Sequence, residues 1–183
     1  MAMLIHINSW PGAGKKTIGE LLALRLKARF VHNHHLVDLV AACCDRSDPQ
    51  WQPLYDRVRE AAYESLAHRP AGEPLVMTNV MAADEVTWWT QICELARRRS
   101  DVLVPVVLTL DADENRKRLL DPTRTGSKLK SVEILDALRA TDSLLVPLDI
   151  ATTLVLDVSR LSPEVAVEHI DAHLQRMPSH RTI

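Results

Sequence analysis

The feature that most constrains the fold is a glycine-rich turn near the N-terminus, placed between an apolar run and an amphipathic segment. Residues 3–8 form a short, β-branched apolar run, which predicts a buried strand. The turn that follows reads Ser9-Trp-Pro-Gly-Ala-Gly-Lys-Lys-Thr17. From Lys15 onward, apolar residues recur at helical spacing, at Ile18, Leu21, Leu22 and Leu26. The sequence therefore predicts a strand, a tight turn and a helix in immediate succession.

Strands and helices alternate along the rest of the chain. Apolar runs predict further strands at residues 28–32, 74–78, 102–110 and 152–158. Helices are predicted at about 36–43, before 68, 84–96, 113–120, 134–138 and 163–174, with Asp84 starting one and Ser162 capping the last. Strands that are apolar on both faces and separated by helices are typical of a parallel sheet covered on each side. We predict a three-layer α/β fold.

Length and composition limit the number of domains and the classes of binding partner. A chain of 183 residues fits a single domain spanning 1–183. The formal charge of −2, from 22 basic and 24 acidic residues, does not favour a nucleic-acid or membrane partner. The three cysteines, two of them adjacent, are no disulfide framework, so we expect a reducing, cytoplasmic environment. No signal peptide or bilayer-length apolar segment is visible, and the sequence leaves the oligomeric state open.

The turn has the chemistry of a phosphate-binding loop. Glycines at positions 12 and 14, with Ala13 between them, let backbone N–H groups converge on phosphate oxygens. The helix that follows adds its N-terminal donors and the positive end of its dipole. Lys15 adds a full positive charge for the β- and γ-phosphates. We predict that this loop binds ATP or GTP through Gly12, Ala13, Gly14, Lys15, Lys16 and Thr17.

The loop departs from the pattern G-x-x-x-x-G-K-[ST] at two positions. Ser9 occupies the first glycine position, and Lys16 stands where a hydroxyl residue usually holds Mg²⁺. In this respect the loop resembles that of the adenylate-kinase branch, G-x-P-G-x-G-K-x-T. That resemblance implies that Thr17 contacts a phosphate and holds Mg²⁺ through water.

Polar residues after the second and third predicted strands are candidates for an acceptor site. The segment His32-Asn33-His34-His35 leads to Asp38, and Asn79 follows the third strand. Ligands of α/β proteins lie at the carboxyl ends of the strands, so we expect Asn33, His34 and Asn79 to contact the acceptor. Asp38 or His34 is the candidate base for an acceptor hydroxyl. The same residues also fit an ordinary polar turn leading into a solvated helix.

Over nearly its full length the chain resembles bacterial P-loop kinases of the AAA-type and shikimate-kinase-like group. The segments that carry the likeness are LIHINSWPGAGKKTIGELLA, the Asn33–His34 turn with Asp38, LVMTNVMAADE, VPVVLTLDADENRKRL and LDVSRLSPEVAVEHI. More distantly, the chain is similar to gluconate kinase, chloramphenicol phosphotransferase and adenylate kinase. The resemblance implies a P-loop NTPase fold with five parallel strands in the order 2-3-1-4-5, and it implies ATP and Mg²⁺ as cofactors.

The resemblance also assigns residues in the second half of the chain. It implies a lid at about 121–130 that closes over ATP, with Arg124 and Lys128 neutralising charge during transfer and Arg116 nearby. It places Arg160 beside the adenine ring, although a plain helix entry explains this residue equally well. His32 stands where the relatives carry aspartate.

Two functions follow from these residues. The first is a kinase that moves the γ-phosphate of ATP to a small molecule, with a hydroxyl as the expected acceptor group. A histidine-rich, arginine-poor acceptor region argues against a phosphate acceptor, which arginine forks usually hold. The alternative is a nucleotide-binding switch or regulatory ATPase without a small-molecule acceptor.

Overall fold

The structure, a computed structural model, describes residues 2–70, 72–122 and 129–177. Five strands, all parallel to their neighbours, form one sheet in the order β2-β3-β1-β4-β5. Their bounds are β1 Met3–Asn8, β2 Arg29–His32, β3 Leu75–Asn79, β4 Val102–Thr109 and β5 Leu154–Asp157. This confirms the parallel sheet and its order 2-3-1-4-5.

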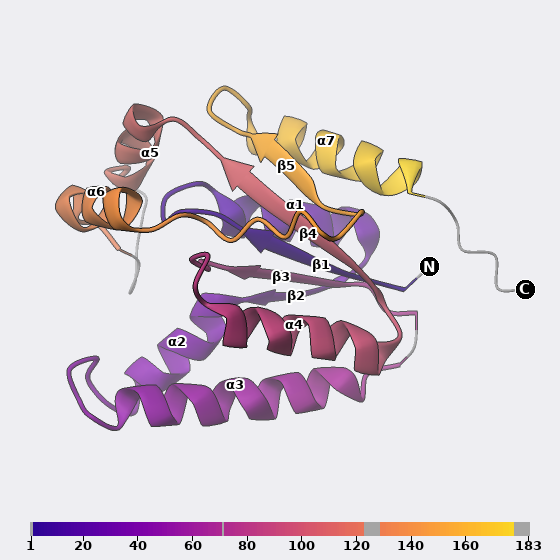
Figure 1. Cartoon of the computed structure of the whole chain (residues 1–183), viewed down its shortest axis with the longest axis horizontal. Coiled ribbons are helices and arrows are strands. Elements are labelled where there is room, and N and C mark those ends of the chain that lie inside the picture. Colours follow the sequence, from indigo (N-terminus) through magenta and orange to yellow (C-terminus); the bar gives the residue numbers. More distant parts are fainter. Residues whose placement is uncertain (1, 71, 123–128, 178–183) are drawn as a thin grey trace, which may run out of the picture.

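Seven helices connect and cover the strands within the described residues. They are α1 Lys15–Leu26, α2 Asn33–Ala41, α3 Trp51–Ala67, α4 Val86–Arg99, α5 Ala112–Leu119, α6 Val132–Thr141 and α7 Pro163–Arg176. Figure 1 shows α1 and α7 on one face of the sheet and α3 and α4 on the other, with α5 and α6 together at one end. The predicted three-layer α/β arrangement is confirmed.

Each face of the sheet has its own apolar core. On the face of α1 and α7, side chains such as Ile5, Ile7 and Ile170 are fully buried. On the face of α3 and α4, Leu4, Met77 and Ile92 are buried in a second cluster. Successive residues of β1 therefore point into opposite cores, which explains why apolar residues occur at neighbouring positions of this strand.

The register of the strands assembles the functional edge. Asn8 at the end of β1 pairs with Asn79 at the end of β3, and His32 at the end of β2 pairs with Thr78. Parallel strands have their carboxyl ends at the same edge of the sheet, where ligands of this fold class bind. The loop after β1 therefore lies beside the ends of β2 and β3.

Two predicted helix starts are corrected, while a third is confirmed. Helix α2 begins at Asn33 rather than at residue 36, so the histidine segment is helical. Asp84 does not start α4, which begins at Val86 after Glu85. The Glu85 carboxylate accepts from the Ala82 N–H at 2.7 Å, so it stabilises the preceding turn. The Ser162 hydroxyl accepts from the Val165 N–H at 3.3 Å and caps α7, as predicted.

Two of the remaining predictions concern the lid and the membrane. Most of the predicted lid at 121–130, including Arg124 and Lys128, lies in residues 123–128, outside the described residues. Throughout the described parts, every helix is too short or too polar to cross a bilayer.

Candidate functional site

The loop between β1 and α1 has the backbone shape that the sequence predicts for phosphate binding. Gly12 and Gly14 have φ angles of 90° and 87°, in the region that favours glycine. Helix α1 begins at Lys15, directly after Gly14, and its first intrahelical bond joins the Ile18 N–H to the Gly14 carbonyl at 3.0 Å. The first turn of a helix presents N–H groups without intrahelical partners. The loop and the helix N-terminus together form a backbone donor site for an anion.

Lys15 lies over this loop. Its Nζ donates to the carbonyl oxygens of Ser9, at 2.9 Å, and Trp10, at 2.8 Å. The side chain is nearly buried, with 8% exposure. These two hydrogen bonds hold the ammonium group against the turn of the loop. A lysine that binds the phosphates of a nucleotide is expected at this position.

Ser9, the departure from the glycine pattern, has a structural role. It is fully buried, and its hydroxyl donates to the Leu108 carbonyl of β4 at 2.7 Å. The extra polar atom is thus hydrogen-bonded, so the position accepts serine without an unsatisfied buried group. The hydroxyl also fixes the start of the loop to the neighbouring strand.

His32 ends β2 and faces β3. Its Nδ1 lies 2.6 Å from the Thr78 hydroxyl oxygen, while its Nε2 is buried with no hydrogen-bond partner among the described residues. Burial, and then the nearby His34 and Lys15, lower the pKa of His32 to about 3. The imidazole is therefore neutral at physiological pH. A neutral ring occupies the position where the resemblance leads one to expect a carboxylate.

The predicted acceptor residues gather at the ends of β2 and β3. Asn33 accepts a hydrogen bond from the Tyr55 hydroxyl at 2.7 Å. His34 Nδ1 lies 3.7 Å from the carboxylate of Asp38 on the exposed side of α2. Asn79 is buried at the end of β3. The structure thus places Asn33, His34 and Asp38 on α2, and it places Asn79 at the end of β3, beside the end of β1 where the phosphate loop begins.

Arg59 is a polar residue near this region that sequence reasoning missed. It is 4% exposed on α3, and its guanidinium carbon lies 4.6 Å from the ring centroid of Trp88 and 5.4 Å from that of Tyr55. Its Nη2 donates to Asp56 at 2.8 Å, whereas Nε and Nη1 have no hydrogen-bond partner among the described residues. No motif marks this arginine, because its neighbours come from two helices.

The remaining predicted nucleotide contacts lie on α1, on α5 and after β5. Arg116 on α5 is paired with Asp136 at 2.9 Å and Asp113 at 2.7 Å. Arg160 is exposed in the loop between β5 and α7. Thr17 and Lys16 lie in the first turn of α1. Ion pairing of Arg116 indicates a structural contact between α5 and α6, and its role toward nucleotide stays a prediction.

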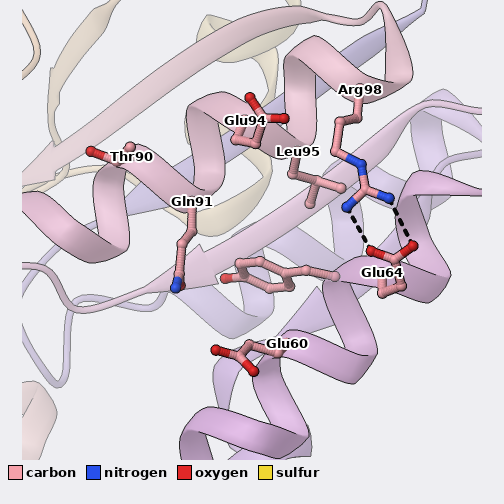
Figure 2. Close-up of a pocket in the computed structure, with 8 residues that line it drawn as sticks. Glu60, Glu64, Thr90, Gln91, Glu94, Leu95 and Arg98 are labelled. Carbon is pink, nitrogen blue, oxygen red and sulfur yellow. Dashed lines mark hydrogen bonds and ion pairs between the residues drawn. The ribbon is translucent and has the colours of Figure 1, made fainter.

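A cavity of about 310 Å³ lies away from the phosphate loop, between α3 and α4. Its lining residues are Glu60, Tyr63, Glu64, Thr90, Gln91, Glu94, Leu95 and Arg98. Figure 2 shows Arg98 facing Glu64 across it, with both ends of the guanidinium bonded to the carboxylate at 2.7 and 2.8 Å. The charges of this groove are thus largely satisfied by an ion pair between the two helices.

Metal-ligating side chains do not cluster in the part of the chain that the structure describes. Those residues contain no group of three or more His, Cys, Asp or Glu placed to hold a metal ion. A metal that arrives with a nucleotide keeps several waters and needs few protein ligands. Thr17 therefore stays the predicted contact.

Comparisons with known proteins agree with this architecture. A protein-family model described as "AAA domain" matches residues 5–139. None of the curated proteins that were compared matches the chain.

Several solved structures have a similar fold. A candidate kinase from Chloroflexus aurantiacus J-10-fl is 19% identical with a TM-score of 0.72, covering 95% of this chain and 99% of its own. A gluconokinase from Sinorhizobium meliloti 1021 is 21% identical with a TM-score of 0.64, covering 95% and 92%. A shikimate kinase from Acinetobacter baumannii in complex with shikimate is 16% identical with a TM-score of 0.64, covering 97% of both chains. At these identities the likeness is one of fold.

Proposed function

Because the chain belongs to the AAA domain family, we propose that it is an ATP-dependent phosphotransferase that moves the γ-phosphate of ATP to a small-molecule acceptor. The observation that carries the proposal is the loop of residues 9–15. Two glycines at positive φ lead directly into a helix N-terminus, and the lysine that begins this helix lies over the loop. This arrangement suits polyphosphate anions, since it combines backbone donors, a helix dipole and the positive charge of Lys15.

The residues present fit ATP. The glycine loop and the first turn of α1 offer N–H donors to the phosphates, and Lys15 exchanges its two carbonyl partners for phosphate oxygens. Bound Mg²⁺ neutralises charge on the phosphates. Thr17 in the first turn is the residue that would hold this ion through water, and Arg160 after β5 would lie beside the base.

The acceptor binds at the carboxyl ends of β2 and β3 in this proposal. Asn33 and His34 on α2 and Asn79 on β3 supply polar contacts at this edge. The similarity in fold to a gluconokinase and to a shikimate kinase in complex with shikimate supports a small-molecule acceptor.

The transfer itself is an in-line displacement. The acceptor oxygen forms a bond to the γ-phosphorus while the bond from that phosphorus to the β,γ-bridging oxygen breaks, and ADP leaves. The hydroxyl proton passes to Asp38 or His34, whose side chains are 3.7 Å apart. Arg124 and Lys128 are proposed to neutralise the transferring group, as the resemblance implies.

A labelled-phosphate screen tests the function. The protein is incubated with γ-labelled ATP, Mg²⁺ and single acceptors, including gluconate, shikimate, neutral sugars, nucleosides and nucleoside monophosphates. Label in an organic product supports a phosphotransferase. Label found only as inorganic phosphate, with every acceptor, contradicts it and favours the regulatory ATPase.

Lys15→Ala tests the phosphate grip without knowledge of the acceptor. Loss of a charge-assisted contact to the phosphates should weaken binding of a non-hydrolysable ATP analogue by about tenfold or more, as measured by calorimetry. Arg97→Ala is the control, because this arginine is exposed on α4 and pairs only with Glu94 in the described structure. Equal affinity of the Lys15 variant and the wild type would remove the loop from the site.

A further inference from the structure

A buried asparagine on α5 forms a hydrogen bond to the backbone of the phosphate loop. Asn115 is fully buried, and its Nδ2 donates to the carbonyl oxygen of Pro11 at 2.7 Å. Pro11 has no N–H, so this carbonyl is its only backbone polar group. The contact joins residues 104 positions apart, and its donor, Asn115, lies outside the loop motif.

The contact determines the direction of a loop donor. The peptide between Pro11 and Gly12 is trans, as are all described peptides. In a trans peptide the C=O and the following N–H point in opposite directions. Because the Pro11 oxygen points toward Asn115, the N–H of Gly12 points to the opposite side of the turn. That side is where a loop of converging N–H groups receives an anion.

Arg139 on α6 determines how Asn115 is oriented. Its Nη1 donates to the Asn115 Oδ1 at 2.9 Å, and its Nη2 donates to the Leu110 carbonyl at 3.2 Å. A guanidinium only donates, so Asn115 must present its oxygen to Arg139 and its NH₂ group to Pro11. The guanidinium carbon also lies 5.9 Å from the ring centroid of Trp10, within the loop itself. The Arg139 guanidinium is thus held by hydrogen bonds to Asn115 and Leu110 and by its contact with the Trp10 ring.

Gly12 makes this close approach possible. A Cβ at Gly12 would lie 2.8 Å from the Asn115 Nδ2. The glycine is therefore needed for the neighbouring asparagine as well as for its own φ of 90°.

We propose that Asn115 and Arg139 are positioning residues that orient the Pro11–Gly12 peptide for polyphosphate binding. The inference rests on the proposed function, because it assigns these residues to the same nucleotide site. Neither residue touches the phosphates: Arg139 acts on Asn115, and Asn115 acts on the loop. Since Asn115 lies on α5 and Arg139 lies on α6, the packing of these two helices and the affinity for polyphosphate are coupled.

The series of contacts from Arg139 to Asn115 to the Pro11 carbonyl is called the relay below. Calorimetry with two probes tests it. The probes are a non-hydrolysable ATP analogue and inorganic tripolyphosphate, which has no base. Asn115→Leu leaves the Pro11 carbonyl without its donor and should weaken the binding of both probes by about tenfold. A similar loss for both probes is expected because the change acts on the phosphate loop. A loss for the ATP analogue alone would overturn the proposal.

A double-mutant cycle separates the relay from direct contact. Arg139→Met should weaken both probes severalfold in the wild type and have no further effect in Asn115→Leu, because the two residues act in series. An equal loss in both backgrounds would show that Arg139 acts independently of Asn115 and would overturn the relay. Arg97→Met, at an exposed site on α4, is the matched arginine control and should bind both probes as the wild type does.

The outcomes distinguish this inference from the proposed function. If the wild type does not bind the ATP analogue, both are wrong. If the wild type binds and the Asn115 and Arg139 variants bind equally well, only the relay is wrong. Asn115→Asp serves as a second variant if Asn115→Leu does not fold: its carboxylate replaces the donor with an acceptor facing Pro11, and unchanged affinity would overturn the relay.

Discussion

At the scale of single residues, the phosphate loop depends on two kinds of residue: those of the motif and those that support the motif through hydrogen bonds. Lys15 and the glycines belong to a recognisable motif, and their conformations follow from it. Ser9 breaks the motif, yet its hydroxyl is bonded to Leu108, and this partner is invisible in the sequence. Asn115 lies in a segment that the sequence predicts only as a charged helix. Motif positions were therefore predictable, whereas the contacts that support them were not.

Gly12 and Gly72 provide a matched pair of substitutions. Both have positive φ, at 90° and 93°, but a Cβ at Gly12 would meet Asn115 at 2.8 Å whereas one at Gly72 would meet nothing within 4 Å. Gly72→Ala should cost only the backbone strain, about 1 kcal/mol in the free energy of unfolding. Gly12→Ala should cost more and should also weaken ATP binding. Urea unfolding and calorimetry measure the two effects; equal results for both variants would contradict the close contact.

At the scale of elements, helix α1 is placed by a glycine that no motif includes. A Cβ at Gly19 would lie 2.5 Å from the ring of Phe30 on β2 and 3.1 Å from the methyl group of Thr78 on β3. The absence of a side chain lets α1 lie close to the strands whose ends carry His32 and Asn79. The same helix begins at Lys15, so its distance from the sheet also sets the position of the phosphate loop.

Gly19→Ala should destabilise the protein even though alanine favours helix. The propensity gain is about 1 kcal/mol, but overpacking against Phe30 costs roughly 1–3 kcal/mol, so we expect a net loss in the free energy of unfolding. The penalty should shrink in a Phe30→Leu background, where the ring edge is gone. Urea denaturation of the four proteins of this cycle provides the measurement, and a stabilised Gly19→Ala single variant would contradict the packing.

At the scale of the whole molecule, two buried histidines make stability depend on pH. His6 lies in β1 with 2% exposure, its Nε2 has no hydrogen-bond partner among the described residues, and burial lowers its pKa from 6.5 to about 4. The pKa of His32 is lowered in the same direction. Below pH 6.5 the unfolded chain takes up these protons first. The folded state therefore loses stability as the pH falls from 6.5 toward 4.

The contribution of His6 is measurable with one variant. Between pH 6.5 and 5 the wild type should lose about 2 kcal/mol through this residue. His6→Phe keeps a ring against Trp89, which lies 5.7 Å from His6 by ring centroids, and removes the titrating group. Urea unfolding at pH 7.5 and pH 5 should show a drop in the free energy of unfolding that is smaller in the variant by this amount. Equal drops would contradict the buried, neutral state of His6.

The sequence alone determined the alternation of strands and helices, the three-layer architecture and the phosphate loop, because these follow from local periodicity and from backbone requirements at Gly12 and Gly14. The strand order came from the resemblance and agrees with the structure. The start of α2 at Asn33 was missed because its cap is an uncommon one, in which the His35 imidazole accepts from the His32 N–H. The start of α4 at Val86 was missed because Glu85 stabilises the turn that precedes it. Only the tertiary structure brought Asn115 and Arg139 to Pro11, because hydrogen bonds between distant residues depend on the packing of whole helices and leave no periodic signal along the chain.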